Sequence, residues 1–149
     1  MRFIPDHLPP EELQALQLEG LIATVNRCYH HSELYAKKFR DAGIHPEAIR
    51  SIEDLQFLPL TDKDDLQEGY PFPLRAAPFE QIVRIHASSG TTGKRKVLCY
   101  TDKDLDVWAN MFARCYELAG LTIRDRVQLA VGYGLWTAGV GFQAGCERF

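Results

Sequence analysis

The sequence predicts an α/β chain, with a mainly helical segment over residues 1–79 packed on an α/β core over residues 80–149. Three observations lead to this prediction. Apolar residues recur at helical spacing in the first segment. Two short β-prone runs, Gln81–His86 and Val97–Thr101, flank a loop rich in glycine and hydroxyl residues. An amphipathic pattern typical of a helix follows over residues 102–119.

Composition bounds the class of protein. A chain of 149 residues is about one domain long, and 46% hydrophobic with 25% charged residues is usual for soluble globular proteins. The net charge of −3 argues against a general nucleic-acid binder, which needs a basic face. No apolar run approaches the ~20 residues of a membrane span, and the start lacks the apolar stretch of a secretion signal. We therefore expect a cytoplasmic protein without a membrane partner.

The sequence does not predict a metal site. Its four cysteines are widely spaced and form no Cys-x-x-Cys pair, so buried reduced thiols are favoured over metal ligands. They are Cys28, Cys99, Cys115 and Cys146. His30 and His31 could form a metal pair or a polar joint between helices, and the joint is favoured because no carboxylate or cysteine lies at ligand spacing.

Two helices are predicted in the first segment. Pro9-Pro10-Glu11-Glu12 is typical of a first helical turn, and apolar residues at helical spacing continue to about Tyr29. A second helix is predicted to begin near Ser32 and to end at Gly43.

Two shorter helices are predicted next. Ser51-Ile-Glu-Asp54 has the pattern of a capping box with Asp in place of Glu. The helix that it begins should end at Phe57-Leu58-Pro59. Thr61-Asp-Lys-Asp64 repeats the capping pattern and predicts another helix.

The second segment contains one further helix and one further strand. Thr101-Asp-Lys-Asp104 should cap a helix that ends near Ala119, just before Gly120. Its aromatic residues, Trp108 and Phe112, are interpreted as core packing. Arg126–Gly132 is predicted to be a buried strand.

The stretch from His86 to Lys96 contains the strongest chemical signal. Glycine allows the backbone to approach an anion closely, hydroxyls donate hydrogen bonds, and lysine supplies positive charge for phosphate oxygens. A polar hairpin turn has the same composition, so both interpretations are open. The stretch lacks the spacing of a Walker A loop and of a dinucleotide-binding loop. His86 could contact a nucleotide or be a structural histidine at a strand end.

A second glycine-rich stretch runs from Tyr133 to Gly141. Glycines at positions 132, 134, 139 and 141 let the backbone pass close to a neighbour, and Tyr133 and Trp136 lie beside them. One interpretation is a glycine-rich junction between a strand and a helix. The other is one wall of an apolar pocket for an aryl group, with an aromatic ring to stack on it.

Ser88-Ser-Gly-Thr-Thr-Gly93 followed by basic residues resembles the phosphate loop of adenylate-forming enzymes, the acyl-CoA synthetase superfamily. Three further patterns resemble phenylacetate–CoA ligases in their order: Ser32–Tyr35, Ala42–Ile44 and Leu58–Leu66. Tyr133–Gly141 is similar to the segment of that family that lines the aryl-acid pocket. Arg95-Lys96 replaces the Pro-Lys of many superfamily members.

The resemblance implies the start of the mixed-sheet N-terminal domain of an adenylate-forming enzyme, truncated. It implies a reaction in which an aryl carboxylic acid, ATP and CoA give a thioester through an acyl-adenylate, with Mg²⁺ on the phosphates. Lys96 is the predicted catalytic residue. The predicted phosphate-binding residues are Ser88, Ser89, Gly90, Thr91, Thr92, Gly93 and Lys96. The predicted acid-binding residues are Tyr133, Gly134, Trp136 and Gly139.

The resemblance also implies that much of the family's machinery lies outside this chain. The adenine and ribose motifs, the hinge and the C-terminal domain are all absent from the sequence. We therefore expect a fragment that is inactive alone and that self-associates through exposed apolar surface, giving a possible homodimer. Two alternatives are open: another adenylate-forming ligase, and a non-catalytic module that binds a nucleotide or a protein.

Overall fold

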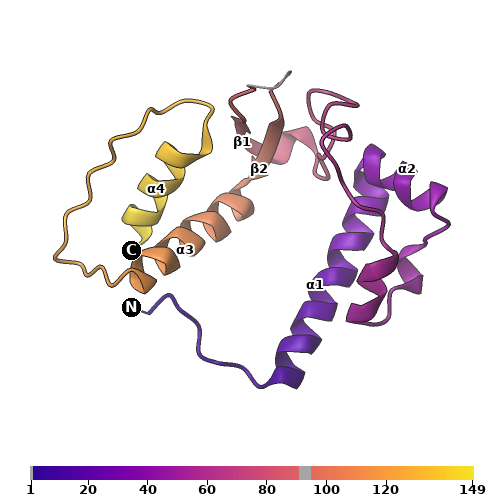
Figure 1. Ribbon diagram of the computed structural model, residues 1–149, viewed down its shortest axis with the longest axis horizontal. Coiled ribbons are helices and arrows are strands. Elements are labelled where there is room, and N and C mark those ends of the chain that lie inside the picture. The colour runs from indigo at the N-terminus through magenta and orange to yellow at the C-terminus, as the bar shows by residue number, and fades with distance from the viewer. Residues whose placement is uncertain (1, 91–94) are drawn as a thin grey trace. The chain divides into compact units, whose positions relative to one another are not determined.

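The computed structural model describes residues 2–90 and 95–149 (Figure 1). Its residues divide into two compact units. The helical unit is His7–Pro78, and the hairpin unit is Phe79–Phe149 together with the start of the chain up to Asp6. The mixture of helices with a small antiparallel sheet confirms the predicted α/β class.

The helical unit begins with α1 (Pro10–His31) and α2 (Glu33–Asp41), which confirms both predicted helices. Proline at the first position and two glutamates in the first turn suit the start of α1, because the free N–H groups there favour negative charge. Ser32 separates the helices and caps α2, accepting the Tyr35 N–H at 3.5 Å. Gly43, with φ of 67°, follows the end of α2.

The core of this unit is small and is formed by side chains from three segments. Val25 of α1 and Phe39 of α2 are buried together with Ile49. The rings of Tyr29 and Phe39 stack, with 6.3 Å between their centroids. Burial of these apolar side chains is what holds α1 and α2 together, since each helix presents its apolar face to the other.

The third predicted helix is present as a 3₁₀ helix, η2 (Ile52–Phe57), which follows a single turn, η1 (Pro46–Ala48). The predicted cap is present: the Asp54 carboxylate accepts the N–H groups of Ser51 and Arg50, both at 2.8 Å. These two bonds favour the charged carboxylate and hold the pKa of Asp54 below its ordinary value.

The predicted helix from Thr61 is wrong, because residues 63–71 form successive turns. The capping bonds lie one residue later than predicted: the Asp62 carboxylate accepts the N–H groups of Asp64 and Asp65 at 2.8 and 2.9 Å, and no helix follows them. Pro71 and Pro73 follow, and neither has the N–H that a growing helix needs. Local side-chain bonds therefore stabilise a turn here instead of a helix.

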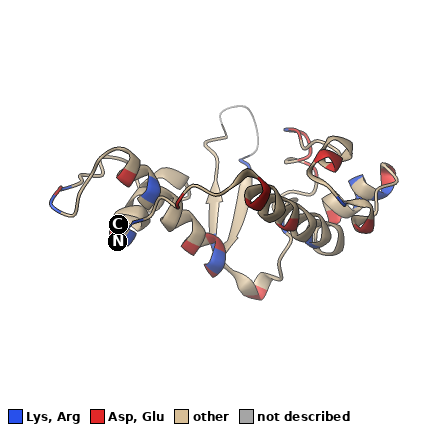
Figure 2. Cartoon of the chain, turned by 90° about the horizontal axis from the view of Figure 1, so that it is seen from below, with Lys and Arg blue, Asp and Glu red and all other residues tan. Residues whose placement is uncertain are grey.

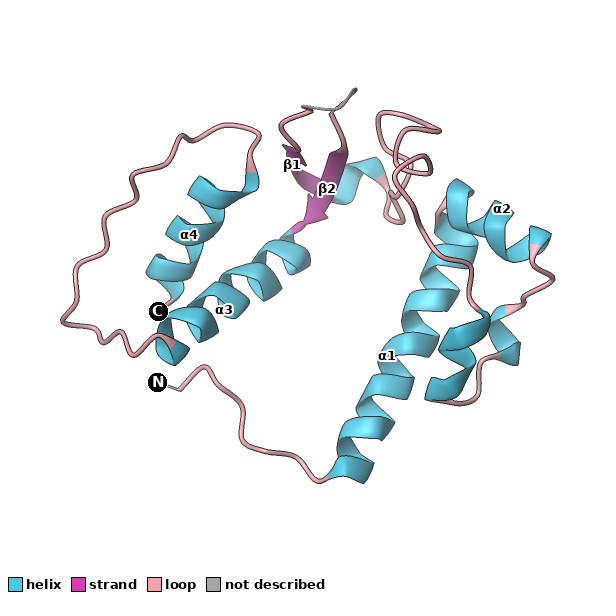
Figure 3. Cartoon of the chain, viewed as in Figure 1, coloured by secondary structure: helices cyan, strands magenta, loops and turns pink. Residues whose placement is uncertain are grey.

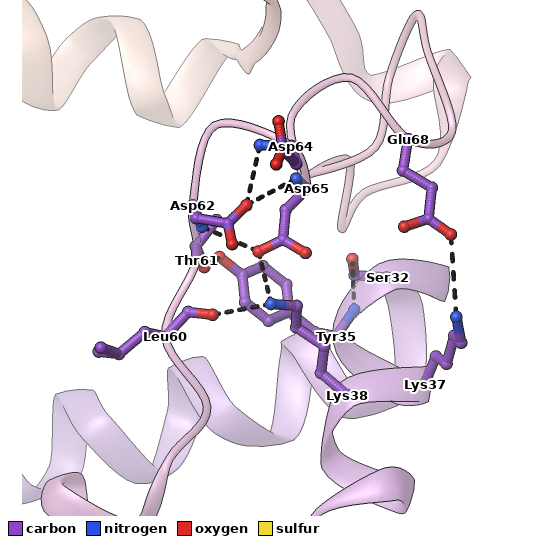
Figure 4. A network of polar contacts seen from close by, with 10 residues as sticks. All are labelled: Ser32, Tyr35, Lys37, Lys38, Leu60, Thr61, Asp62, Asp64, Asp65 and Glu68. Carbon is purple, nitrogen blue, oxygen red and sulfur yellow. Dashed lines mark hydrogen bonds and ion pairs between the residues drawn. The ribbon is translucent and has the colours of Figure 1, made fainter.

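A polar network attaches these turns to α2 (Figure 4). Lys38 of α2 donates to the Asp65 carboxylate at 2.5 Å and to the Leu60 carbonyl at 2.8 Å. The hydroxyls of Tyr35 and Thr61 lie 2.7 Å apart, and Asp65 also accepts the Asp62 N–H at 2.8 Å. Because the Lys38–Asp65 pair is largely shielded from water, it is stronger than an exposed ion pair.

We expect the stability of the helical unit to fall in acid through Asp65. The hydrogen bond from Lys38, followed by that from the Asp62 N–H, holds the pKa of Asp65 below its ordinary value. A lowered pKa in the folded state stabilises the fold above the unfolded value of about 3.9. That stabilisation disappears as the pH falls through the folded-state pKa. Urea unfolding followed by circular dichroism should therefore show a lower midpoint for Asp65→Asn at neutral pH and no difference from wild type in strong acid.

Glu68→Gln is the matched control for this prediction. Glu68 pairs with Lys37 across 3.8 Å, and both side chains are well exposed, so the change should have little effect at any pH. An Asp65→Asn defect of the same size in strong acid as at neutral pH would contradict the role of the carboxylate charge.

The hairpin unit contains the two predicted strands, β1 (Ile82–Ala87) and β2 (Val97–Thr101), which follow a short turn, η3 (Phe79–Gln81). They pair antiparallel, with Ile85 opposite Cys99 and Ala87 opposite Val97. In the part of the chain that the structure describes, these two strands form the sheet (Figure 3). The glycine-containing stretch connects these two strands in the sequence, and its residues 91–94 lie outside the described residues.

Two helices, α3 (Asp102–Leu118) and α4 (Thr137–Arg148), lie side by side in this unit (Figure 1). The predicted cap of α3 is present, since Thr101 and Asp104 exchange hydrogen bonds of 2.8 and 3.3 Å. Phe112 packs edge-on against Phe142 of α4 at 5.1 Å, which confirms its interpretation as core packing. The Tyr116 hydroxyl donates to the Phe142 carbonyl at 3.0 Å.

The predicted strand Arg126–Gly132 is wrong, because these residues belong to a mostly exposed loop between α3 and α4. A strand is stable only when a neighbouring strand pairs with its backbone. In the described residues the sheet consists of β1 and β2, and neither pairs with this segment. The apolar composition of this segment therefore predicted a buried strand where the structure has an exposed loop.

Candidate functional site

The base of the predicted phosphate loop is closed by a pair of residues at the ends of β1 and β2. The Ser88 N–H donates to the Lys96 carbonyl, and the Lys96 N–H donates to the Ser88 hydroxyl oxygen, both at 3.0 Å. The Ser88 hydroxyl accepts in the second bond, so its own hydrogen is available to a ligand. Ser88 and Lys96, eight residues apart, thus stand on opposite sides of one loop.

The structure describes both sides of this loop. Ser89 is exposed, and Gly90 has φ of 72°, a backbone conformation that glycine adopts without strain. Lys96 is partly buried and Arg95 is exposed. Thr91, Thr92 and Gly93 lie outside the described residues. The roles predicted for all these residues stay predictions.

The second predicted stretch lies against the end of β1. The Leu135 carbonyl accepts two hydrogen bonds, from the Ala87 N–H at 2.8 Å and from His86 Nδ1 at 3.1 Å. These bonds bring together the end of β1, where the predicted phosphate loop begins, and the glycine-rich stretch, which are far apart in the sequence. Sequence reasoning missed this contact, because a backbone carbonyl has no residue-specific signal.

The aromatic side chains on either side of Leu135 are available to a ligand. Tyr133 is 54% exposed and Trp136 is 53% exposed. A Cβ atom added to Gly134 would meet nothing within 4 Å. A Cβ added to Gly139 would lie 2.9 Å from the Gly132 carbonyl oxygen, so glycine is required at position 139 for packing within the chain. Its predicted contact with the acid stays a prediction.

His86, which donates one of the two hydrogen bonds to the Leu135 carbonyl, is buried among aromatic side chains. Its side chain is 1% exposed, and its ring meets those of Tyr100 and Trp108 edge-on at 5.3 and 5.0 Å. Because a carbonyl only accepts, Nδ1 carries the hydrogen of the bond to Leu135. Within residues 2–90 and 95–149, the buried Nε2 has no hydrogen-bond partner. Burial also raises the pKa of Tyr100.

The residues considered as metal ligands have other surroundings. His30 packs edge-on against Tyr29, with 5.2 Å between the ring centroids, and is 6.4 Å from His31. Burial raises the pKa of the Cys28 thiol, which packs against the core of the helical unit. Among the described residues, no group of three His, Cys, Asp or Glu side chains is placed to hold a metal ion. Nor does any helix in that part of the chain have the length and apolarity to cross a membrane.

Comparison with known proteins identifies relatives over more than nine-tenths of the chain. It is 49% identical over 138 residues to the phenylacetate–coenzyme A ligase of Escherichia coli and 46% identical to that of Aromatoleum evansii. The corresponding ligase of Thermus thermophilus is 44% identical over 140 residues. These matches cover 93 to 94% of this chain and 31 to 32% of the ligases. No family profile matches the chain.

Solved structures of a second CoA ligase have a similar fold. The fold is similar to 2-hydroxyisobutyryl-CoA ligase in an open conformation in complex with 2-HIB-AMP and CoA, with a TM-score of 0.84 and 27% identity. The likeness covers 95% of this chain and 34% of that ligase. The same ligase in its thioesterification state gives a TM-score of 0.83 at 29% identity. The predicted resemblance is confirmed: over nine-tenths of its length the chain is a homologue of phenylacetate–coenzyme A ligases, and it spans about a third of theirs.

Proposed function

We propose that the chain is the phosphate-loop part of an ATP-dependent aryl-acid–CoA ligase that acts on phenylacetate or a close analogue. The Leu135 carbonyl is the observation that best supports this proposal, because it joins the loop bearing Lys96 to the segment bearing Trp136. ATP and an aryl carboxylate must meet for adenylation, and these two stretches offer the groups that each of them needs. The names of the relatives support the same reaction.

In the first half-reaction, a carboxylate oxygen bonds to the α-phosphorus of ATP, and the bond from that phosphorus to the bridging oxygen breaks. Pyrophosphate leaves with the electron pair. Negative charge grows on the departing phosphates, so donors and cations placed there lower the barrier. We assign this role to Lys96 and to the hydroxyl and amide groups of Ser88, Ser89, Gly90, Thr91, Thr92 and Gly93. In the second half-reaction, the CoA sulfur bonds to the acyl carbon, the thiol loses its proton and AMP leaves.

The acid is assigned to Tyr133, Gly134, Trp136 and Gly139. Exposed aromatic rings on both sides of Leu135 offer stacking surface for an aryl group. Mg²⁺ would arrive on the phosphates of ATP, because the described residues of the loop offer it no carboxylate. We therefore assign no metal ligand to this chain.

We further propose a cytoplasmic protein that binds neither nucleic acid nor membrane and that can form a homodimer. Basic and acidic residues are interspersed along the chain (Figure 2), whereas a nucleic-acid binder needs a basic face. Large apolar side chains such as Leu60 and Ile123 are more than four-fifths exposed, which favours association. The division into a helical segment over residues 1–79 and an α/β core over residues 80–149 belongs to the same proposal.

Two measurements on the native gene product test the proposed function. Its intact mass should be about three times the 16.9 kDa of this chain, as the relatives' lengths imply. It should then exchange pyrophosphate into ATP only when phenylacetate or a close analogue is present. Exchange with an unrelated acid would favour another adenylate-forming ligase, which the likeness to a 2-hydroxyisobutyryl-CoA ligase makes the second candidate. A native mass near 16.9 kDa without exchange would indicate a non-catalytic module.

Trp136 should determine how well the acid binds. In Trp136→Ala, loss of the stacking surface should raise the KM for phenylacetate about tenfold in pyrophosphate exchange and leave the KM for ATP unchanged. Ile123→Ala is the control, since Ile123 is 89% exposed on the same loop outside the proposed pocket. An unchanged KM for phenylacetate would remove Trp136 from the pocket.

A further inference from the structure

We propose that His86 is a positioning residue, which holds the acid-binding segment at the end of β1 through the Leu135 carbonyl. The inference rests on the proposed function, because it assigns a purpose to a contact within that site. His86 touches no substrate in this proposal. It acts through the backbone between Tyr133 and Trp136, and so on the acid rather than on ATP.

The geometry gives His86 one specific contact. Its Nδ1 hydrogen is donated to the Leu135 carbonyl at 3.1 Å, and the adjacent Ala87 N–H donates to the same oxygen at 2.8 Å. Two donors on one carbonyl restrict its position more than one does, because the two bonds come from different directions. The rings of Tyr100, on β2, and Trp108, on α3, hold the imidazole in place.

The remaining ring nitrogen argues that packing alone does not explain His86. Nε2 is buried and has no hydrogen-bond partner among the described residues, and such an atom costs stability. Phenylalanine would fill the same space between Tyr100 and Trp108 without that cost. What histidine offers, and phenylalanine lacks, is the Nδ1 hydrogen that binds Leu135.

The hydrogen bonds that close the base of the phosphate loop do not depend on His86. An effect on acid binding can therefore be separated from an effect on ATP binding. Ser88 and Lys96 exchange two hydrogen bonds at the base of the loop, and neither bond involves His86. Loss of the His86 bond should therefore loosen the segment around Leu135 and leave the loop closed. We therefore expect the KM for the acid to change and the KM for ATP to stay the same.

The test uses His86→Phe and His86→Asn in the native gene product. Phenylalanine keeps an aromatic ring without a donor, whereas the side-chain amide of asparagine can donate from nearly the position of Nδ1. In His86→Phe, hydrogen exchange at the Ala87 amide should become about fivefold faster, and the KM for phenylacetate should rise about fivefold, as expected for one lost hydrogen bond. The KM for ATP should not change. His86→Asn should restore both values toward wild type.

Three results would overturn the proposal: unchanged exchange at Ala87 in His86→Phe, equal increases in the two KM values, or identical behaviour of the two variants. If His86→Phe does not fold, His86→Gln replaces it, because its longer amide is placed to mimic Nε2 and cannot restore the Nδ1 bond. If the wild-type protein exchanges no pyrophosphate with any aryl acid, the proposed function fails. The Ala87 amide still reports whether His86 holds Leu135.

Discussion

Lys96→Gln should lower kcat/KM for phenylacetate-dependent pyrophosphate exchange about 100-fold in the native gene product. The lysine charge is assigned to the phosphates that leave, and removing one such donor from a transition state costs about this factor. The bonds between Ser88 and Lys96 are made by the Lys96 backbone, so they survive the substitution. The loop should therefore keep its closure and lose only the charge.

The kinetic pattern distinguishes this role from simple binding. A group that acts in the transition state lowers kcat and kcat/KM together, whereas a group that binds ATP uniformly raises KM alone. We expect the first pattern for Lys96. Lys103→Gln is the matched control, because Lys103 is an exposed lysine in the first turn of α3 and lies outside the proposed site. If both variants lost activity equally, the loss of one positive charge anywhere on the protein would explain the result, and the position of Lys96 at the loop would not.

Gly145→Ala should destabilise the hairpin unit by about 1–3 kcal/mol, the usual cost of overpacking a core. A Cβ atom at position 145 would overlap the Cβ of Phe112 and would lie 3.1 Å from the Tyr116 ring. The Cβ of Phe112 belongs to the rigid start of that side chain, so a rotamer change cannot make room. Relief of the overlap requires α4 to move away from α3. Urea unfolding followed by circular dichroism measures the effect.

Gly20→Ala is the control for this prediction. Gly20 also lies within a helix, α1, but an added Cβ would meet nothing within 4 Å. Replacing a glycine by alanine in an open helical position should stabilise the chain by about 1 kcal/mol. The same chemical change should therefore have opposite signs at the two positions. Stabilisation by Gly145→Ala would show that α3 and α4 do not pack as described.

Local signals in the sequence predicted the elements whose stability is local. Thr101 and Asp104 predicted the start of α3 because a capping box involves four consecutive residues and no distant partner. The β-prone runs on both sides of the glycine-rich loop predicted β1 and β2 because the loop brings them together as a hairpin. The order of short motifs also predicted the resemblance that the relatives confirm.

The same local signals were insufficient where other bonds compete with them. The pattern at Thr61 predicted a helix, but the capping bonds form one residue later, at Asp62 and Asp65. Prolines at 71 and 73 and the attachment to Lys38 stabilise turns there instead. Arg126–Gly132 has the composition of a strand, but pairing depends on a partner strand that composition cannot supply.

The sequence by itself determined the helix caps, the hairpin and the residue types of the candidate site. The tertiary structure alone decided which of these residues meet. Leu135 acts through its backbone carbonyl, and Gly145 allows close packing because it has no side chain. Neither residue type therefore indicates its partner. The physical reason is that capping energy depends on neighbours in sequence, whereas close packing and backbone hydrogen bonds depend on neighbours in space.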